Sequence, residues 1–215
     1  MKLRGSVVAV GTALALLAGG CSSVETAPNR HTLQQPFDEM VPFWKDLGIT
    51  GLKVTLVTIS DHSVSCGPRH ITNSDTSHAT FCYRAEGEDT IFISDRSYES
   101  GEDYAGRKGI SPEAMGAAVI GHELGHAVIA QAGLLVESGK GDKEELLADC
   151  LAGAAIAATS PELGAEAAAF FETIGSDNHG SDQERKAAFQ NGFDNGVAGC
   201  DPALAIRLGI PAASK

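Results

Sequence analysis

Two histidines and a glutamate stand out as residues whose spacing could support chemistry. His122 and His126 are four positions apart, and Glu123 directly follows the first of them. Residues four apart lie on one face of a helix, so both imidazoles can reach a single cation while Glu123 projects beside them. Imidazole is a common zinc ligand, and a carboxylate next to the ion can take a proton from water. The pattern therefore predicts a Zn2+ site that promotes hydrolysis, although two hydrogen-bonded core histidines would show the same spacing.

A zinc site of that kind needs a third protein ligand and keeps a fourth position for water. In the metzincin class, glycine and histidine follow the second histidine, but Ile129 and Ala132 occupy those positions here and exclude the class. Farther along the chain, Glu145 and Asp149 are again four residues apart. Glu145 can bind the metal while Asp149 accepts the remaining ring N–H of a ligand histidine, which fixes the tautomer of that ring. We therefore expect Glu145 to complete the site.

These two acids have a simpler interpretation, in which both are solvated and Asp142 and Glu145 form a capping box. Asp149 argues against it, because it lies between Ala148 and Cys150 in an otherwise apolar, alanine-rich segment. An unpaired carboxylate is costly in such surroundings. Asp149 is therefore expected to have a partner.

The histidines must be positioned by a helix with a well-marked start. Ser111 can cap its first turn, Pro112 fits the first helical position, and Glu113 lies near the positive end of the helix dipole. The helix should continue to about Gln131 and end before Gly133.

Three more helices are predicted after this one. The first begins near Asp142 and ends before Pro161, the second covers about 161–174, and the third begins at Ser181 with Glu184 in a capping box.

The first part of the chain predicts a short helix near 37–47 and two strands, at Lys53–Ser60 and Thr90–Ser94. The second strand could expose an edge that pairs with an extended peptide, or it could be purely structural. Together these elements predict a helix-rich α+β fold with a small sheet.

The amino terminus predicts export from a bacterial cytoplasm. Lys2 and Arg4 precede a short apolar run and small residues that end at Cys21, which is the pattern of a signal peptide over 1–20. The letters Leu-Ala-Gly-Gly-Cys resemble the bacterial lipobox, in which the cysteine receives a diacylglycerol. The alternative is a plain secretory signal with a chance cysteine. We expect a lipid-anchored protein on the outer side of a membrane in the cell envelope.

Charge and composition bound the remaining chain. Residues 21–35 are rich in Ser, Thr, Pro, Asn and Gln and predict a lipidated cysteine followed by a flexible tether, whereas 36–215 suffice for one domain. The formal charge of −12 becomes more negative when the signal peptide is removed. Nucleic acid is therefore not an expected partner.

The cysteines agree with an oxidising compartment. Without Cys21, an even number remains, namely Cys66, Cys82, Cys150 and Cys200. Three connectivities are possible. We favour Cys66 with Cys82, which bracket a polar loop, and Cys150 with Cys200, which would fix the carboxyl-terminal segment to a helix. Four buried thiols are the alternative.

The chain resembles the neutral zinc metallopeptidases, which are zincins of the glutamate type, over most of the region from Phe37 to Cys200. The segments that carry the resemblance are Val119–Val128, Glu145–Gly153, His179–Ser181, Gln183–Gly196, Phe43–Trp44, Cys66–Gly67 and Phe81–Cys82 before the Ile91–Ile93 strand. The linker between the two motif helices is shorter than in the family. Tyr83, Arg84 and Ala85 stand where the family has Pro-Ala-Asp. The resemblance implies a zincin-like α+β fold with a strand edge beside the cleft.

From these residues we expect a peptidase that hydrolyses peptide bonds in peptide or protein substrates. Zinc supplies a Lewis acid and an acidified water, and Glu123 acts as general base and then as proton donor to the leaving amine. The resemblance implies that His179 stabilises the oxyanion, although its turn-like surroundings also suit an exposed loop residue. Arg185 is expected on a helix surface, with a contact to Asp149 or to substrate as the alternative.

The competing hypothesis is a non-catalytic surface lipoprotein that zinc stabilises and that acts as a binding module. A structural zinc site has four protein ligands and needs no base beside it. Three candidate ligands and the adjacent Glu123 therefore favour the enzyme.

Overall fold

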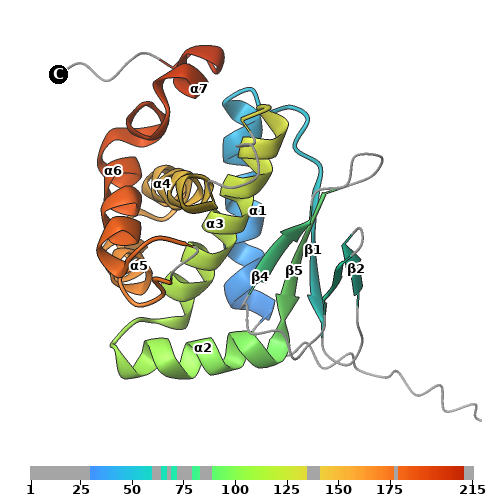
Figure 1. Ribbon diagram of the computed structural model, residues 1–215, viewed down its shortest axis with the longest axis vertical. Coiled ribbons are helices and arrows are strands. Elements are labelled where there is room, and N and C mark those ends of the chain that lie inside the picture. Colours follow the sequence, from blue (N-terminus) through green and yellow to red (C-terminus); the bar gives the residue numbers. More distant parts are fainter. Residues whose placement is uncertain are drawn as a thin grey trace, which may run out of the picture.

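A computed structural model describes residues 30–59, 64–66, 69–71, 79–82, 89–134, 141–176 and 179–210. The predicted signal peptide and the lipidation site Cys21 lie outside this part of the chain. The described residues form a helix-rich α+β fold, with helices on one side and a small sheet on the other (Figure 1).

The elements follow one another as α1 (Arg30–Asp46), β1 (Val54–Ile59), β2 (Val64–Cys66), β3 (Arg69–Ile71), β4 (Ala79–Cys82), β5 (Asp89–Ser94), α2 (Asp95–Arg107), α3 (Pro112–Gln131), α4 (Gly141–Thr159), the 3-10 turn η1 (Pro161–Leu163), α5 (Gly164–Phe171), α6 (Asp182–Cys200) and α7 (Pro202–Arg207). Among the described helices, none is both long enough and apolar enough to cross a membrane.

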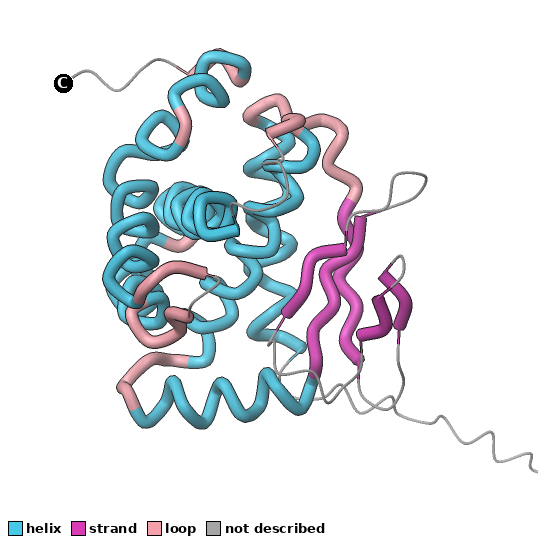
Figure 2. Tube along the Cα trace, in the orientation of Figure 1, coloured by secondary structure: helices cyan, strands magenta, loops and turns pink. Residues whose placement is uncertain are grey.

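The three-stranded sheet has the order β1-β5-β4, with β5 parallel to β1 and antiparallel to β4 (Figure 2). A separate antiparallel pair is formed by β2 and β3. The possibility that Thr90–Ser94 exposes a strand edge is therefore wrong, because β5 is the central strand and pairs on both sides. The outer strands of the described sheet are β1 and β4.

All six residues of β5 are buried, which explains its central place. Ile91 and Ile93 point into the large helical core, whereas Phe92 packs with Ile59 and Cys82 in a second, smaller cluster. Alternate side chains of a strand point to opposite faces, so both faces of this strand are covered. Sequence alternation alone could not distinguish this strand from an edge strand.

The helix α3 connects the sheet to the other helices. It packs against β4 and β5 on one side and against α4 on the other, and α4 in turn packs against α6 (Figure 1). Most residues of α3 are buried, including Met115, Val119 and Ile120. Its central position means that the neighbouring elements fix the place of both histidines.

Small residues bring α3 and α4 close together beside the histidines. A Cβ added at Gly125 would lie 2.7 Å from the carbonyl oxygen of Ala148, and one added at Gly121 would lie 3.1 Å from Cβ of Ala152. Neither position has room for a larger side chain without movement of α4. The glycines that flank the histidine motif therefore allow α4 to approach it.

On its far side, α4 makes an equally close contact with α6. A Cβ added at Gly153 or Gly192 would overlap backbone atoms of the opposite helix. A disulfide between Cys150 and Cys200 joins the same two helices. A second disulfide joins Cys66 to Cys82. Both cysteine pairings predicted from the sequence are thus confirmed.

Local signals predicted the amino-terminal caps of α3 and α6 correctly. Ser111 caps α3 by accepting a hydrogen bond from the backbone N–H of Ala114, and Ser181 and Glu184 form the capping box of α6. The predicted helix over 161–174 is shorter than expected, because a 3-10 turn precedes α5 and the helix ends at Phe171.

The amino-terminal helix corrects the predicted tether. It begins at Arg30 instead of near Phe37, so residues 30–35 belong to the folded domain and not to a spacer. The physical reason is an apolar stripe at helical spacing, in which Leu33, Met40 and Trp44 are buried in the core. Two prolines within the helix and its polar first turn hid this pattern.

Candidate metal centre

Three predicted ligand side chains converge on one point. Nε2 of His122 lies 3.1 Å from Nε2 of His126, and Oε2 of Glu145 lies 3.1 Å from the first and 3.5 Å from the second. Tetrahedral zinc with ordinary bond lengths keeps its ligand atoms roughly 3.3 Å apart. The His-His-Glu group therefore has the dimensions needed to hold one metal ion.

The environment of Glu145 tests whether these residues fit a cation. Its Oε2 atom is buried and accepts no hydrogen bond of normal geometry from any described residue. Such an atom costs free energy unless a partner satisfies it. A cation in contact with both Nε2 atoms would satisfy Oε2, so the donor set fits a metal.

Carboxylates hold both imidazoles from behind. Nδ1 of His122 lies 2.7 Å from Oδ1 of Asp149, and Nδ1 of His126 lies 3.3 Å from Oε1 of Glu144. When each Nδ1–H donates to its carboxylate, each Nε2 lone pair points at the common centre. Asp149 thus lies where the sequence predicted, whereas the contact of Glu144 was missed.

The same carboxylates favour positive charge at this point. Burial alone lowers the pKa of His122, but Asp149 and Glu145 outweigh it and raise that pKa above its ordinary value. Burial also opposes the charge of His126, yet Glu144 and Glu145 raise its pKa to about 10. Burial raises the pKa of Glu145, and the two imidazoles more than reverse this, so that it falls well below its usual range.

Arg185 is buried, so the expected position on a helix surface is wrong. Its Nε and Nη2 atoms donate to the two carboxylate oxygens of Asp149 at 2.8 and 2.7 Å, and Nη1 donates to the carbonyl oxygen of Ile174 at 3.2 Å. The guanidinium also lies over the ring of Phe171. A fully buried carboxylate needs a countercharge, and Arg185 supplies it.

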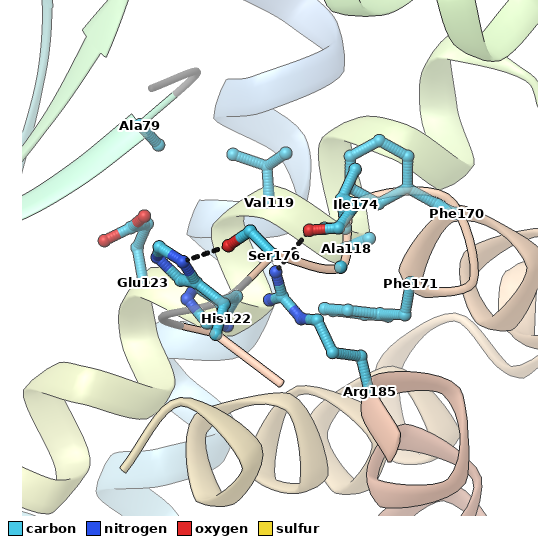
Figure 3. Close-up of a pocket in the computed structure, with 12 residues that line it drawn as sticks. Ala79, Ala118, Val119, His122, Glu123, Phe170, Phe171, Ile174, Ser176 and Arg185 are labelled. Atoms are coloured by element: carbon cyan, nitrogen blue, oxygen red, sulfur yellow. Dashed lines mark hydrogen bonds between the residues drawn. The ribbon is translucent and has the colours of Figure 1, made fainter. Parts of the chain in front are cut away.

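A cavity of about 460 Å³ opens beside His122 of the His-His-Glu group (Figure 3). His122 and Glu123 lie on one side of it, and Phe170 and Ile174 lie on the other. Its lining residues are Ala79, Ala118, Val119, His122, Glu123, Phe170, Phe171, Ile174, Gly175, Ser176, His179 and Arg185. Glu123 and His179, the two predicted catalytic residues, therefore border the same space.

Glu123, the predicted proton acceptor, is largely buried and lines the cavity beside His122. The residue is only 7% exposed, and its carboxylate accepts no hydrogen bond from any residue that the structure describes. It is not part of the converging ligand group but lines the cavity next to His122. Its side chain is thus part of the wall that a molecule in the cavity would contact.

His179 has a half-exposed side chain in the turn between α5 and α6. Its Nε2 lies 3.8 Å from Oε2 of Glu145, and its Nδ1 lies 2.9 Å from Oγ of Ser176. A backbone bridge between Ser176 and Gly180 closes this turn. The structure therefore places the residue both in a loop, as its surroundings indicated, and at the cavity.

The strand that borders the cavity is β4, which contributes Ala79 (Figure 3). The sequence did not predict β4, because it is only four residues long. A disulfide through Cys82 fixes this strand to β2.

Comparison with known protein families, with curated proteins and with solved structures finds no match to this chain.

Proposed function

We propose that this chain is a zinc-dependent peptidase with a zincin-like fold of the glutamate type. One observation carries the proposal: a His-His-Glu group of metal-binding dimensions lies beside a cavity that Glu123 also lines. The resemblance to the neutral zinc metallopeptidases supports the same function.

The chain's own residues would divide the work of hydrolysis. A zinc ion held by His122, His126 and Glu145 would supply a Lewis acid for the scissile carbonyl and would acidify a water. Glu123 takes the proton of the attacking water and later delivers it to the leaving amine. When Ser176 donates to Nδ1 of His179, the ring carries its proton on Nε2 and would offer it to the carbonyl oxygen as negative charge develops there.

The position of β4 supports a peptide as substrate. An outer strand beside the cavity can pair with an extended chain through backbone hydrogen bonds, which would make recognition depend on backbone more than on side chains. The mature protein would act outside the cytoplasm, anchored to a membrane through lipid on Cys21. The two disulfides agree with this compartment.

The decisive experiment is the Glu123→Gln variant. It keeps the three metal ligands and the shape of the cavity but removes the proton acceptor, so we expect unchanged zinc content and a loss of turnover of about 10²- to 10⁴-fold. Bound metal is measured by atomic absorption, and cleavage of an unfolded protein is followed with and without chelator. Equal turnover in the variant would refute the proposed mechanism.

A second candidate is a zinc-stabilised binding module, and one distance favours it. Nε2 of His179 is 3.8 Å from the ligand oxygen of Glu145, so a small movement of its turn would make it a fourth ligand, as in structural zinc sites. The His179→Ala variant separates the two. In a peptidase it lowers kcat and leaves zinc affinity nearly unchanged, whereas in a module it lowers zinc affinity strongly.

A further inference from the structure

One helix, α4, provides three carboxylates to the two histidines of α3. Glu145 faces the common centre, Asp149 lies behind His122, and Glu144 lies behind His126. Both imidazoles thus have a carboxylate at Nδ1. The close approach of α3 and α4 at their small residues places all three acids at once.

The two rear carboxylates differ in their charge balance. Asp149 is fully buried and its charge is matched by Arg185, which contacts both of its oxygens. Glu144 is partly exposed, and no lysine or arginine in the described part of the chain forms an ion pair with it. Among the described residues, the carboxylate behind His126 therefore has no lysine or arginine partner, whereas Arg185 matches the charge behind His122.

A carboxylate behind an imidazole affects the ring in two ways. It holds Nδ1–H, which keeps the Nε2 lone pair of His126 directed at the centre, and it makes the ring more basic and thus a stronger ligand. It also adds negative charge near the cation. The longer contact of 3.3 Å weakens the hydrogen bond, but solvent screens the charge only in part because the ring of His126 is largely buried.

We propose that Glu144 is a positioning residue for His126 that strengthens zinc binding through its hydrogen bond and its negative charge. This role rests on the proposed function, since it requires zinc at the His-His-Glu group. It differs from the role of Asp149, whose charge Arg185 cancels. Nothing in the spacing of the histidine motif indicates Glu144, because its role depends on how α4 faces α3.

Three variants of the full chain separate how the charge of Glu144, its hydrogen bond and its position affect zinc affinity. Glu144→Gln keeps an acceptor of the same size but removes the charge, and Glu144→Ala removes both. Asp142→Asn is the matched control, because it removes the same charge from the exposed first turn of α4. Zinc affinity is measured by competition with a chromophoric chelator, and circular dichroism verifies that each variant is folded.

We expect zinc affinity to fall several-fold in Glu144→Gln, by about 10- to 100-fold in Glu144→Ala, and by less than about twofold in Asp142→Asn. The absorption spectrum of bound Co2+ should also shift in Glu144→Ala, because the ring of His126 loses its fixed orientation. Unchanged zinc affinity and an unchanged cobalt spectrum in Glu144→Ala would overturn the role of Glu144 alone. A parent chain that binds no zinc would overturn the proposed function as well.

Discussion

At the scale of single residues, the candidate centre is defined by its excess of negative charge. The carboxylates near the two imidazoles are those of Glu123, Glu144, Glu145 and Asp149. Asp149 is the most deeply buried of them, and Arg185 neutralises its charge. Carboxylates at this density would repel one another unless positive charge lay between them. The site is therefore stabilised either by protons on the imidazoles or by a metal ion.

This charge balance predicts how stability depends on pH when zinc is removed by a chelator. Burial opposes protonation of His126, but Glu144 and Glu145 raise its pKa from 6.5 to about 10. A raised pKa in the folded state adds stability below the ordinary value, and this stability is lost as the pH rises through the folded value. We expect the chelated protein to become less stable between about pH 6.5 and pH 10.

Urea unfolding at several pH values measures this loss. His126→Gln, which removes the titrating ring, should flatten the dependence. Added zinc should also flatten it, because neutral imidazoles bind the ion and protons no longer compete at high pH. A chelated protein whose stability is the same at both ends of this range would contradict the charge balance.

Helical periodicity explains which site residues could be predicted from the sequence. His122 with His126, and Glu145 with Asp149, are spaced by four, so each pair shares one face of its helix wherever the helix packs. Glu144 and the buried place of Arg185 could not be predicted in this way. Their contacts depend on the packing of α4 against α3 and of α6 against α4, which the spacing within one helix does not determine.

At the scale of elements, the close contact between α3 and α4 determines whether the metal ligands converge. Gly125 is one residue before His126, and a Cβ there would lie 2.7 Å from the carbonyl oxygen of Ala148 and 2.9 Å from its Cα. Gly125→Ala should therefore push α4 away, which moves Glu145 from the histidines. We expect a loss of about 1 to 3 kcal/mol in the free energy of unfolding, with weaker zinc binding.

Two other glycines provide the controls for this substitution. Gly121 meets Cβ of Ala152 at 3.1 Å, so Gly121→Ala should be milder in both respects. Gly106 in α2 has nothing within 4 Å of an added Cβ, so Gly106→Ala should be neutral or stabilising by about 0.5 kcal/mol. Thermal unfolding and chelator competition check the order. Equal zinc affinity in Gly125→Ala and Gly106→Ala would show that the close contact between α3 and α4 does not determine whether the ligands converge.

Elements that are marked by local sequence patterns were predicted, whereas elements that depend on contacts with distant residues were missed. The starts of α3 and α6 are fixed by serine caps and acidic residues within one turn, so local pattern was sufficient. The helix α2 was not predicted, because it is mostly polar and buries little more than Tyr98 and Ala105, so its apolar face is too narrow to recognise in the sequence. The strand β4 exists because it pairs with β5 and is linked by Cys82, and neither contact is visible in the local sequence.

At the scale of the whole molecule, the candidate metal centre lies between the sheet and the helices α4 and α6, which are joined to each other. The ligands come from α3 and α4, β4 borders the cavity on one side, and α6 holds α4 from the other side. The helix α6 is joined to α4 by the Cys150–Cys200 disulfide and by the ion pair of Arg185 with Asp149. The ligand set itself includes no residue of α6.

This arrangement predicts that stability and metal binding respond differently to loss of the Cys150–Cys200 disulfide. Its loop of 50 residues implies a loss of about 4 kcal/mol on the chain-entropy account when both cysteines become serine. The folded fraction should nevertheless keep zinc, since the three ligands remain on α3 and α4, and zinc should raise the melting temperature of the variant. The matched control replaces Cys66 and Cys82, whose loop of 16 implies about 3 kcal/mol. A folded Cys150→Ser, Cys200→Ser variant without zinc affinity would show that α6 is needed to hold the ligands in place.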